Sequence, residues 1–264
     1  MKNIKRYLRI YRAILKINLV YLLTYRANFI NNIVSALGWG AFQIVWIVLL
    51  TGKRGTAFGW TQDDMIFLTL GYFMVLGIFH FIFTRNFDTF SRIVDRGELD
   101  AILLKPIDSQ FHSTMRIVNY ANLVRAIVGI VLIIIWSSLK HYHMSPIDIV
   151  FFCIYVGVGV MTMYSIWLIF VTMIIWYPNL SNMVDLLFTI NGFARYPVEM
   201  VRNSGKIALY IFIPLLLSIS APIKILIHKN ATQDIITLTL ICIGLFMFSR
   251  WLWKWALRYY TSAS

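Results

Sequence analysis

The stretch from Ile149 to Trp176 reads IVFFCIYVGVGVMTMYSIWLIFVTMIIW and contains no charged side chain. A helix needs about 20 mostly apolar residues to cross the hydrocarbon core of a bilayer. This stretch is longer than that, so it predicts a membrane-spanning helix. A spanning segment must satisfy its own backbone hydrogen bonds, and the prediction therefore extends to the fold class, an all-α membrane protein.

The composition of the whole chain agrees with this prediction. Of its 264 residues 59% are hydrophobic and only 13% are charged, whereas soluble domains carry about 25% charged residues. The net charge of +13 would suggest nucleic acid in a soluble protein. Here the basic residues lie at the ends of apolar runs, where they orient a membrane protein, so no nucleic-acid partner is expected.

Six spanning segments are expected within one transmembrane domain, residues 1–264. Their boundaries are 27–50, 65–84, 117–139, 149–176, 181–196 and 235–257. Met1–Arg26 carries seven basic residues and no acidic one, which predicts a cytoplasmic N-terminus. Arg250, Lys254 and Arg258 predict a cytoplasmic C-terminus as well, and two cytoplasmic ends require an even number of crossings.

The fifth crossing is the ambiguous one. The segment 181–196 is short and contains Asp185, whereas Ile207–Ile227 is longer but contains Pro214 and Pro222. Interior prolines break the helical hydrogen-bond ladder. We therefore expect 181–196 to cross and 205–228 to form a re-entrant external hairpin, broken at its prolines. The length of Ile207–Ile227 leaves the reverse assignment open.

The N-terminal segment 1–26 is amphipathic. At 100° per residue its basic side chains fall on one side of a helix and its leucines on the other. This pattern predicts a helix lying on the cytoplasmic membrane surface. It is either a topology anchor or a connecting helix that contacts a cytoplasmic partner. The basic residues that would face the membrane surface or the partner are Lys5, Arg9, Arg12 and Lys16.

Charged residues of both signs surround a few leucines in the segment 88–112. We expect a short cytoplasmic helix here that ends near Pro106. One interpretation is a solvated loop. The other is a docking helix, because mixed charge around an apolar centre gives register at an interface. The residues concerned are Asp95, Arg96, Gly97, Glu98, Leu99, Asp100, Leu103, Leu104, Lys105 and Pro106.

Three stretches resemble one branch of the bacterial type-2 ABC exporter permeases. They are RGELDAILLKP at Arg96–Pro106, RYPVEM at Arg195–Met200 and IPLLLSISAP at Ile213–Pro222. The resemblance implies six spans, a second permease subunit as homodimer or heterodimer, and a separate ABC ATPase subunit. It also implies that Asp95–Pro106 is the coupling helix for that ATPase, and that the protein lies in the bacterial cytoplasmic membrane.

The resemblance further implies an external gate near Tyr196, Pro197, Pro214 and Pro222. The chain lacks a phosphate-binding loop of its own, since neither Gly52-Lys53 nor Gly205-Lys206 has the upstream glycine or the following Ser or Thr. No cofactor is therefore expected on this chain, and ATP and Mg are expected on the partner ATPase. The expected activity is export of a hydrophobic or amphipathic substrate, without catalysis by the permease itself.

Polar groups at membrane depth are candidates for function because burying them is costly. Arg125 is expected to snorkel toward the cytoplasmic headgroups. Asp185 either pairs with Arg125 or faces the translocation path. Asn28 and Asn32 line up near the start of the first span, where side-chain amides can link helices. His80 is expected at the interface.

Other chemistry has little support in the sequence. There is no Ser/His/Asp constellation and no H-E-x-x-H motif. His141 and His143 lack further metal ligands nearby. Two alternatives to the exporter stay open: a secondary transporter, which would need paired midplane acids and related halves, and a structural membrane protein.

Overall fold

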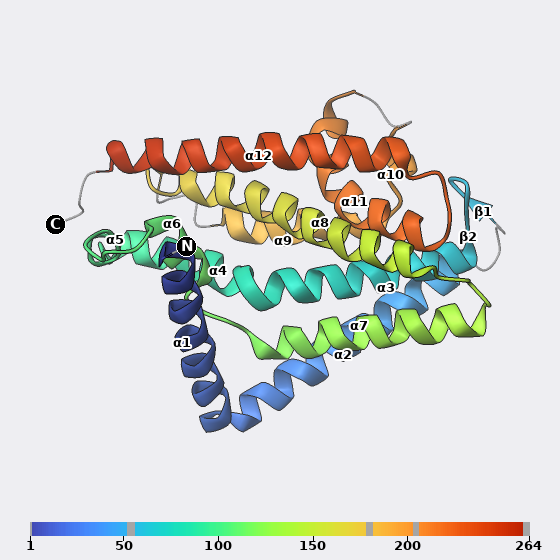
Figure 1. Ribbon diagram of the computed structural model, residues 1–264, viewed down its shortest axis with the longest axis horizontal. Helices are drawn as coiled ribbons and strands as arrows, with labels where there is room; N and C mark the ends of the chain where they lie inside the picture. Colours follow the sequence, from blue (N-terminus) through green and yellow to red (C-terminus); the bar gives the residue numbers. More distant parts are fainter. Residues whose placement is uncertain (1, 52–55, 178–181, 203–205, 261–264) are drawn as a thin grey trace.

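Figure 1 shows the computed structural model, which describes residues 2–51, 56–177, 182–202 and 206–260. Five helical segments in these ranges are long and apolar enough to cross a membrane. They comprise α2 (Arg26–Thr51), α3 (Gln62–Phe79) with its continuation, α7 (Tyr120–Leu139), α8 (Pro146–Met173) and α12 (Thr232–Arg258). The prediction of an all-α membrane protein is confirmed, and the count of six spans stays a prediction.

The central helix is longer than the span predicted at 65–84. α3 continues through a π-helical turn, η1 (His80–Thr84), into α4 (Arg85–Asp95). The helix runs on past Thr84 because its next turns also have an apolar side to bury. Phe87, Phe90, Ile93 and Val94 on α4 are all buried. The first part of the predicted cytoplasmic segment, residues 88–112, is therefore the end of this helix.

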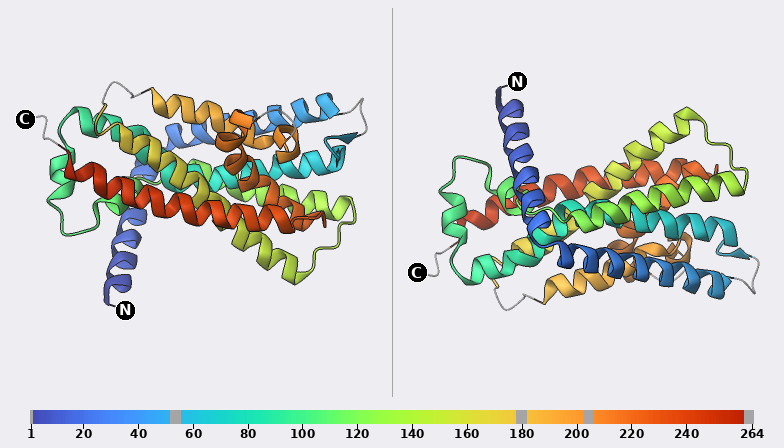
Figure 2. Two further views of the ribbon diagram at one scale, coloured as in Figure 1. Left: turned by 90° about the horizontal axis from the view of Figure 1, so that it is seen from above. Right: turned by 90° about the horizontal axis from the view of Figure 1, so that it is seen from below.

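The two ends of the bundle differ in what they carry (Figures 1 and 2). One end, called the α6 end below, holds α5 (Leu99–Leu103) and α6 (Ser109–Met115). The other end, called the hairpin end, holds the antiparallel strands β1 (Thr56–Ala57) and β2 (Trp60–Thr61). The long helices run between these two ends.

Two of the long helices begin at the hairpin end with capping boxes. Thr61 accepts a hydrogen bond from the Asp64 amide, and the Asp64 carboxylate accepts one from the Thr61 amide. Ser145 and Asp148 repeat the arrangement ahead of α8, whose first residue is Pro146. Such boxes satisfy amides that have no partner in the first helical turn, so both helix starts are encoded locally.

Small residues let the helices approach closely. A Cβ atom on Gly77 of α3 would lie 2.6 Å from the Ala126 backbone nitrogen of α7, and one on Gly129 of α7 would lie 2.8 Å from Met74 Cβ. Gly159 of α8 likewise lies against the Ser218 carbonyl. Close backbone approach of this kind is typical of helices packed within a membrane.

The amphipathic helix α1 (Lys2–Thr24) runs steeply across the axis of the bundle at the α6 end (Figure 1). Its basic residues Lys5, Arg9, Arg12 and Lys16 are exposed. A helix in this orientation lies along a membrane surface when the bundle stands across the membrane, as the sequence predicts.

The region of the fifth crossing differs from the prediction in detail. In place of one helix over 181–196, the structure has α9 (Met183–Asn191) followed by the 3₁₀ turn η3 (Gly192–Arg195); residue 181 lies outside the described residues. α10 (Val198–Arg202) and α11 (Lys206–Leu226) follow. The expectation that prolines break the second segment is wrong.

α11 is one continuous helix that includes both Pro214 and Pro222. These prolines are buried, and α11 packs against α8 and α3. Surrounding helices make the missing backbone hydrogen bonds tolerable, because the freed carbonyls are not left facing lipid. The first residue of the expected hairpin, residue 205, lies outside the described residues.

Candidate functional site

The segment predicted to couple to a partner is built around a tight turn. Asp95 ends α4, and Gly97 has a φ of +69°. The Glu98 amide donates to the Ile93 carbonyl at 2.9 Å, and the Gly97 amide donates to the Val94 carbonyl at 3.0 Å. This is a Schellman cap, in which glycine takes the left-handed position. The expectation of a single helix beginning at Asp95 is therefore wrong, because Gly97 stops one helix and α5 starts another.

The short helix α5 separates buried from exposed leucines. Leu99 and Ile102 are buried and hold α5 against the bundle. Leu103 lies at the boundary, and Leu104, which follows the helix, is 86% exposed. Arg96 and Glu98 in the preceding turn are exposed and lie 3.9 Å apart. The surface offered at the α6 end is thus an exposed leucine flanked by charges of both signs.

Side chains from α12 and α8 fix α6 beside this surface. Arg250 forms a two-pronged ion pair with Asp108, whose Oδ1 lies 3.0 Å from Nη1. Arg250 also donates to Gln110, and Gln110 donates to the Tyr164 hydroxyl at 2.7 Å. Burial alone would raise the pKa of Asp108, but hydrogen bonds from Arg250 and the Phe111 amide hold that pKa below its usual value.

The helix α1 is bonded to the same region. Arg6 donates to the Pro106 carbonyl at 2.6 Å, and the Tyr7 hydroxyl accepts from the Asp108 amide at 3.0 Å. Farther along α1, Asn18 donates to the Arg116 carbonyl at 3.2 Å. α1 is thus joined directly to the predicted coupling segment, through residues about 100 positions apart in the sequence.

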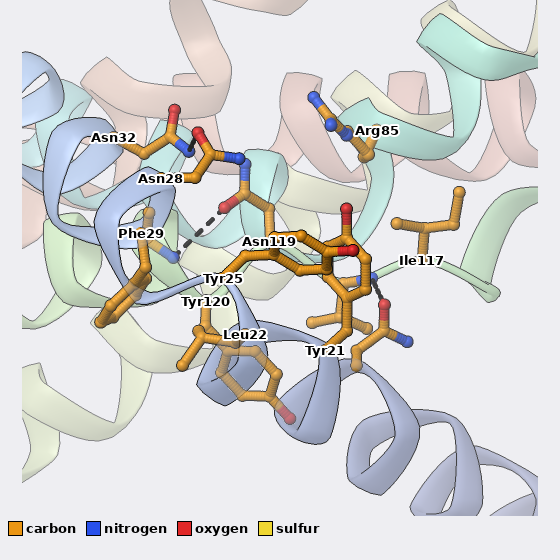
Figure 3. Close-up of a pocket in the computed structure, with 13 residues that line it drawn as sticks. Tyr21, Leu22, Tyr25, Asn28, Phe29, Asn32, Arg85, Ile117, Asn119 and Tyr120 are labelled. Carbon is orange, nitrogen blue, oxygen red and sulfur yellow. Dashed lines mark hydrogen bonds between the residues drawn. The ribbon is translucent and has the colours of Figure 1, made fainter.

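Asn28 and Asn32 line a polar pocket at the elbow between α1 and α2 (Figure 3). The Asn32 amide donates to the Asn28 carbonyl oxygen at 3.3 Å. Asn18, Asn119 and the exposed Arg85 also border this pocket, which has a volume of about 100 Å³. The two asparagines predicted as a polar pair do lie together, at the elbow and not within the buried core.

Arg125 corrects one expectation. Its side chain is only 7% exposed, and its guanidinium lies over the Phe73 ring, 4.6 Å from the centroid. It points into the bundle, so the expectation that it snorkels to the headgroups is wrong. Asp185 on α9 is exposed, and within the described residues the two do not form an ion pair. His80 also lies inside, on the π-helical turn, with its ring 5.7 Å from that of Phe188.

The hairpin end holds a buried ion cluster that sequence reasoning missed. Lys224 near the end of α11 is 4% exposed and bonds both Glu199 of α10 and Asp234 of α12. Glu199 also accepts from the Trp60 indole at 2.9 Å. Glu199 and Lys224 therefore meet at the hairpin end, although they are 25 positions apart in the sequence.

A second group of polar contacts borders this cluster. Lys229 contacts Asp64 at 2.8 Å, and the Tyr142 hydroxyl donates to the same carboxylate at 3.3 Å. Burial and the Asp64 charge raise the pKa of Tyr142 to about 12. Tyr196 has the extended backbone that precedes a proline, and Pro197 is buried. The loops of the hairpin end are thus held by charges drawn from segments far apart in the sequence.

No group of three or more His, Cys, Asp or Glu side chains that could hold a metal gathers in the described ranges. Residues 37–264 match the family model described as "ABC-2 family transporter protein". No curated protein and no solved structure matches the chain. The match covers most of the sequence, including the turn at Gly97 and the cluster around Lys224. The chain therefore belongs to the ABC-2 transporter family, as an ABC-2 type permease.

Proposed function

We propose that this chain is the permease subunit of an ATP-driven exporter in the bacterial cytoplasmic membrane. A separate ABC ATPase subunit would bind ATP and Mg and dock at the α6 end, and a second permease subunit would complete the path. The substrate would be a hydrophobic or amphipathic molecule moved outward. Both termini would then face the cytoplasm.

The observation that carries this proposal is the exposed turn from Arg96 to Leu104. Leu104 is 86% exposed although it lies beside two buried anchors, Leu99 and Ile102. An exposed leucine between opposite charges suits a cleft in a soluble partner, since the leucine supplies contact area and the charges supply register.

The contacts behind the turn connect α5 to the spanning helices. A displacement of α5 would be transmitted to α6, and from α6 to α12 through Asp108–Arg250 and to α8 through Gln110–Tyr164. The same displacement would move α1 through the hydrogen bond of Arg6. ATP binding can shift the permease only if the ATPase contacts its two conformations differently. Contacts that tie α6 to two spans allow such a difference to reach the membrane.

The exposed apolar face of α2 supports a second permease subunit. Trp39, Phe42 and Trp46 lie one helical turn apart, and their rings stack in series on the outside of the bundle. Large apolar rings of this kind fit either lipid or another helix. In the proposed assembly, α2 of the second subunit would contact them.

Copurification tests the proposal. A tagged chain is purified from its native membrane in mild detergent, and an ABC ATPase subunit is expected with it. Leu104→Arg should reduce the recovered ATPase by about tenfold, because a new charge would be buried at the contact. Leu139→Arg is the matched control. Leu139 is also an exposed leucine, but it is the last residue of α7 and lies at the hairpin end, away from Leu104. Absence of any ATPase from the unmodified complex would refute the proposal.

A further inference from the structure

A buried guanidinium inside the bundle forms no ion pair with a carboxylate of the residues that the structure describes. Arg125 lies about 8 Å inside the start of α7, from the rise of 1.5 Å per residue. In the part of the chain that the structure describes, its Nε atom has no hydrogen-bond partner. A cation at this depth is costly unless an opposite charge or an acceptor reaches it.

The acidic residues of the chain lie elsewhere. All but one of the eleven belong to the two ends of the bundle or to the segments just before them. The exception is Asp185, whose side chain is exposed on α9. Arg125 lies over the face of Phe73, and such a contact supplies only part of what a carboxylate would.

Further polar groups gather around the same place from four segments. The Tyr72 hydroxyl interacts electrostatically with both Arg125 and Arg195, and the Gln43 side chain lies within reach of it. Gln43 is 2% exposed, and its Oε1 has no partner among the described residues. The Arg195 Nε likewise has none there. Tyr72 thus lies within electrostatic range of both guanidinium groups, and the four side chains come from α2, α3, α7 and η3.

Asn191, the last residue of α9, adds a further buried polar side chain. Asn191 is 2% exposed, and both polar atoms of its amide are without a partner in the described ranges. One turn earlier on α9, Phe188 contacts the His80 ring, and His80 in turn lies within the electrostatic range of Arg125. Native proteins rarely leave several neighbouring buried polar groups unpaired.

We propose that Arg125 and Arg195, with Tyr72 and Asn191, form a binding site for an oxyanion carried by an amphipathic substrate. A guanidinium donates two parallel N–H groups to a carboxylate or a phosphate, which lysine cannot do. The rings of Phe73 and Tyr196, which lie against the two guanidinium groups, suit an apolar body attached to the anion. The inference rests on the proposed function, since an oxyanion site inside the bundle has a use only in a chain that transports an amphipathic substrate.

The test measures binding without nucleotide or ATPase, so its outcome is independent of the copurification experiment. The full chain is placed in phosphatidylcholine nanodiscs, and the immobilised fraction of spin-labelled stearic acid is compared with that of its methyl ester at alkaline pH. The proposal predicts that the ionised acid binds about tenfold more strongly than the ester. Arg125→Gln and Arg195→Gln should each remove most of this preference.

Arg12→Gln is the control, because Arg12 is exposed on α1 and can attract anions only through the surface. High salt should screen that surface attraction and leave the preference due to the buried site. If Arg125→Gln does not fold, as judged by gel filtration, Arg195→Gln decides, since Arg195 is only half-buried. Equal binding of acid and ester, an unchanged preference in Arg195→Gln, or displacement of the acid by acetate alone would each overturn the proposal.

Discussion

At the scale of single residues, Lys224 is the side chain on which the hairpin end depends most. It joins α11 to α10 and α12 through two carboxylates and is almost fully buried. Lys224→Met would remove the buried cation that Glu199 and Asp234 share. Breaking a buried ion pair on one side costs about 3–5 kcal/mol, so we expect a clear drop in the thermal unfolding midpoint.

Lys140→Met is the control for this change. Lys140 lies 3.0 Å from Asp63 at the same end, but both side chains are more than a third exposed. An exposed pair contributes about 0–1 kcal/mol, so this variant should unfold near the wild-type temperature. Equal losses in the two variants would show that burial of Lys224 does not matter.

Asp108 gives a prediction that depends on pH. Its folded-state pKa is depressed, so its contribution to stability is present above the ordinary aspartate pKa of about 3.9 and is lost as the pH falls through the lower, folded value. Asp108→Asn should lose about 1 kcal/mol, a modest figure because the pair is partly exposed. The difference in unfolding midpoint between wild type and Asp108→Asn should be constant from about pH 5 to 8 and shrink below about pH 4. A difference that grows on acidification would contradict this assignment.

At the scale of elements, the turn at Gly97 decides where α4 stops and what α5 presents. The φ of +69° disfavours residues with a Cβ, yet no atom lies within 4 Å of where that Cβ would be. Any effect of substitution is therefore conformational. Asn tolerates the left-handed region and β-branched residues do not, so Gly97→Val should weaken ATPase copurification severalfold and Gly97→Asn should largely retain it.

Gly157→Val is a suitable control, because Gly157 on α8 also has open space around it and an ordinary helical backbone. Loss of the ATPase in Gly97→Asn as well as Gly97→Val would mean that glycine is needed for contact rather than for backbone geometry.

The elements show how far the sequence could predict the fold. The charge-free run of α8 and the amphipathic pattern of α1 are local signals, and both helices occur near their expected positions. The continuity of α11 could not be predicted, because tolerance of Pro214 and Pro222 depends on the helices that surround them. The break at Gly97 had a local signal, a glycine between two apolar runs, which charge patterning alone did not capture.

At the scale of the whole molecule, the interactions that join distant segments of the chain could not be predicted from the sequence. Arg250 was expected only to orient the C-terminus, whereas it binds Asp108 of α6. Arg125 was expected at the surface because its distance from the helix start permits snorkelling. Its guanidinium instead lies over the Phe73 ring inside the bundle. Such pairings join residues far apart in the chain, and only the packed helices decide them.

The proposed function places the contact with the ATPase at the α6 end, and a cross-link tests that proposal most directly. A photoreactive amino acid is placed at Leu104, and at Leu139 as control, in the otherwise unmodified chain within its native membrane. If the ATPase docks at the α6 end, position 104 should form an adduct with an ABC ATPase subunit, identified by mass spectrometry, and position 139 should form none. An intact complex in which position 104 yields no ATPase adduct, or in which both positions yield it equally, would contradict docking at the α6 end.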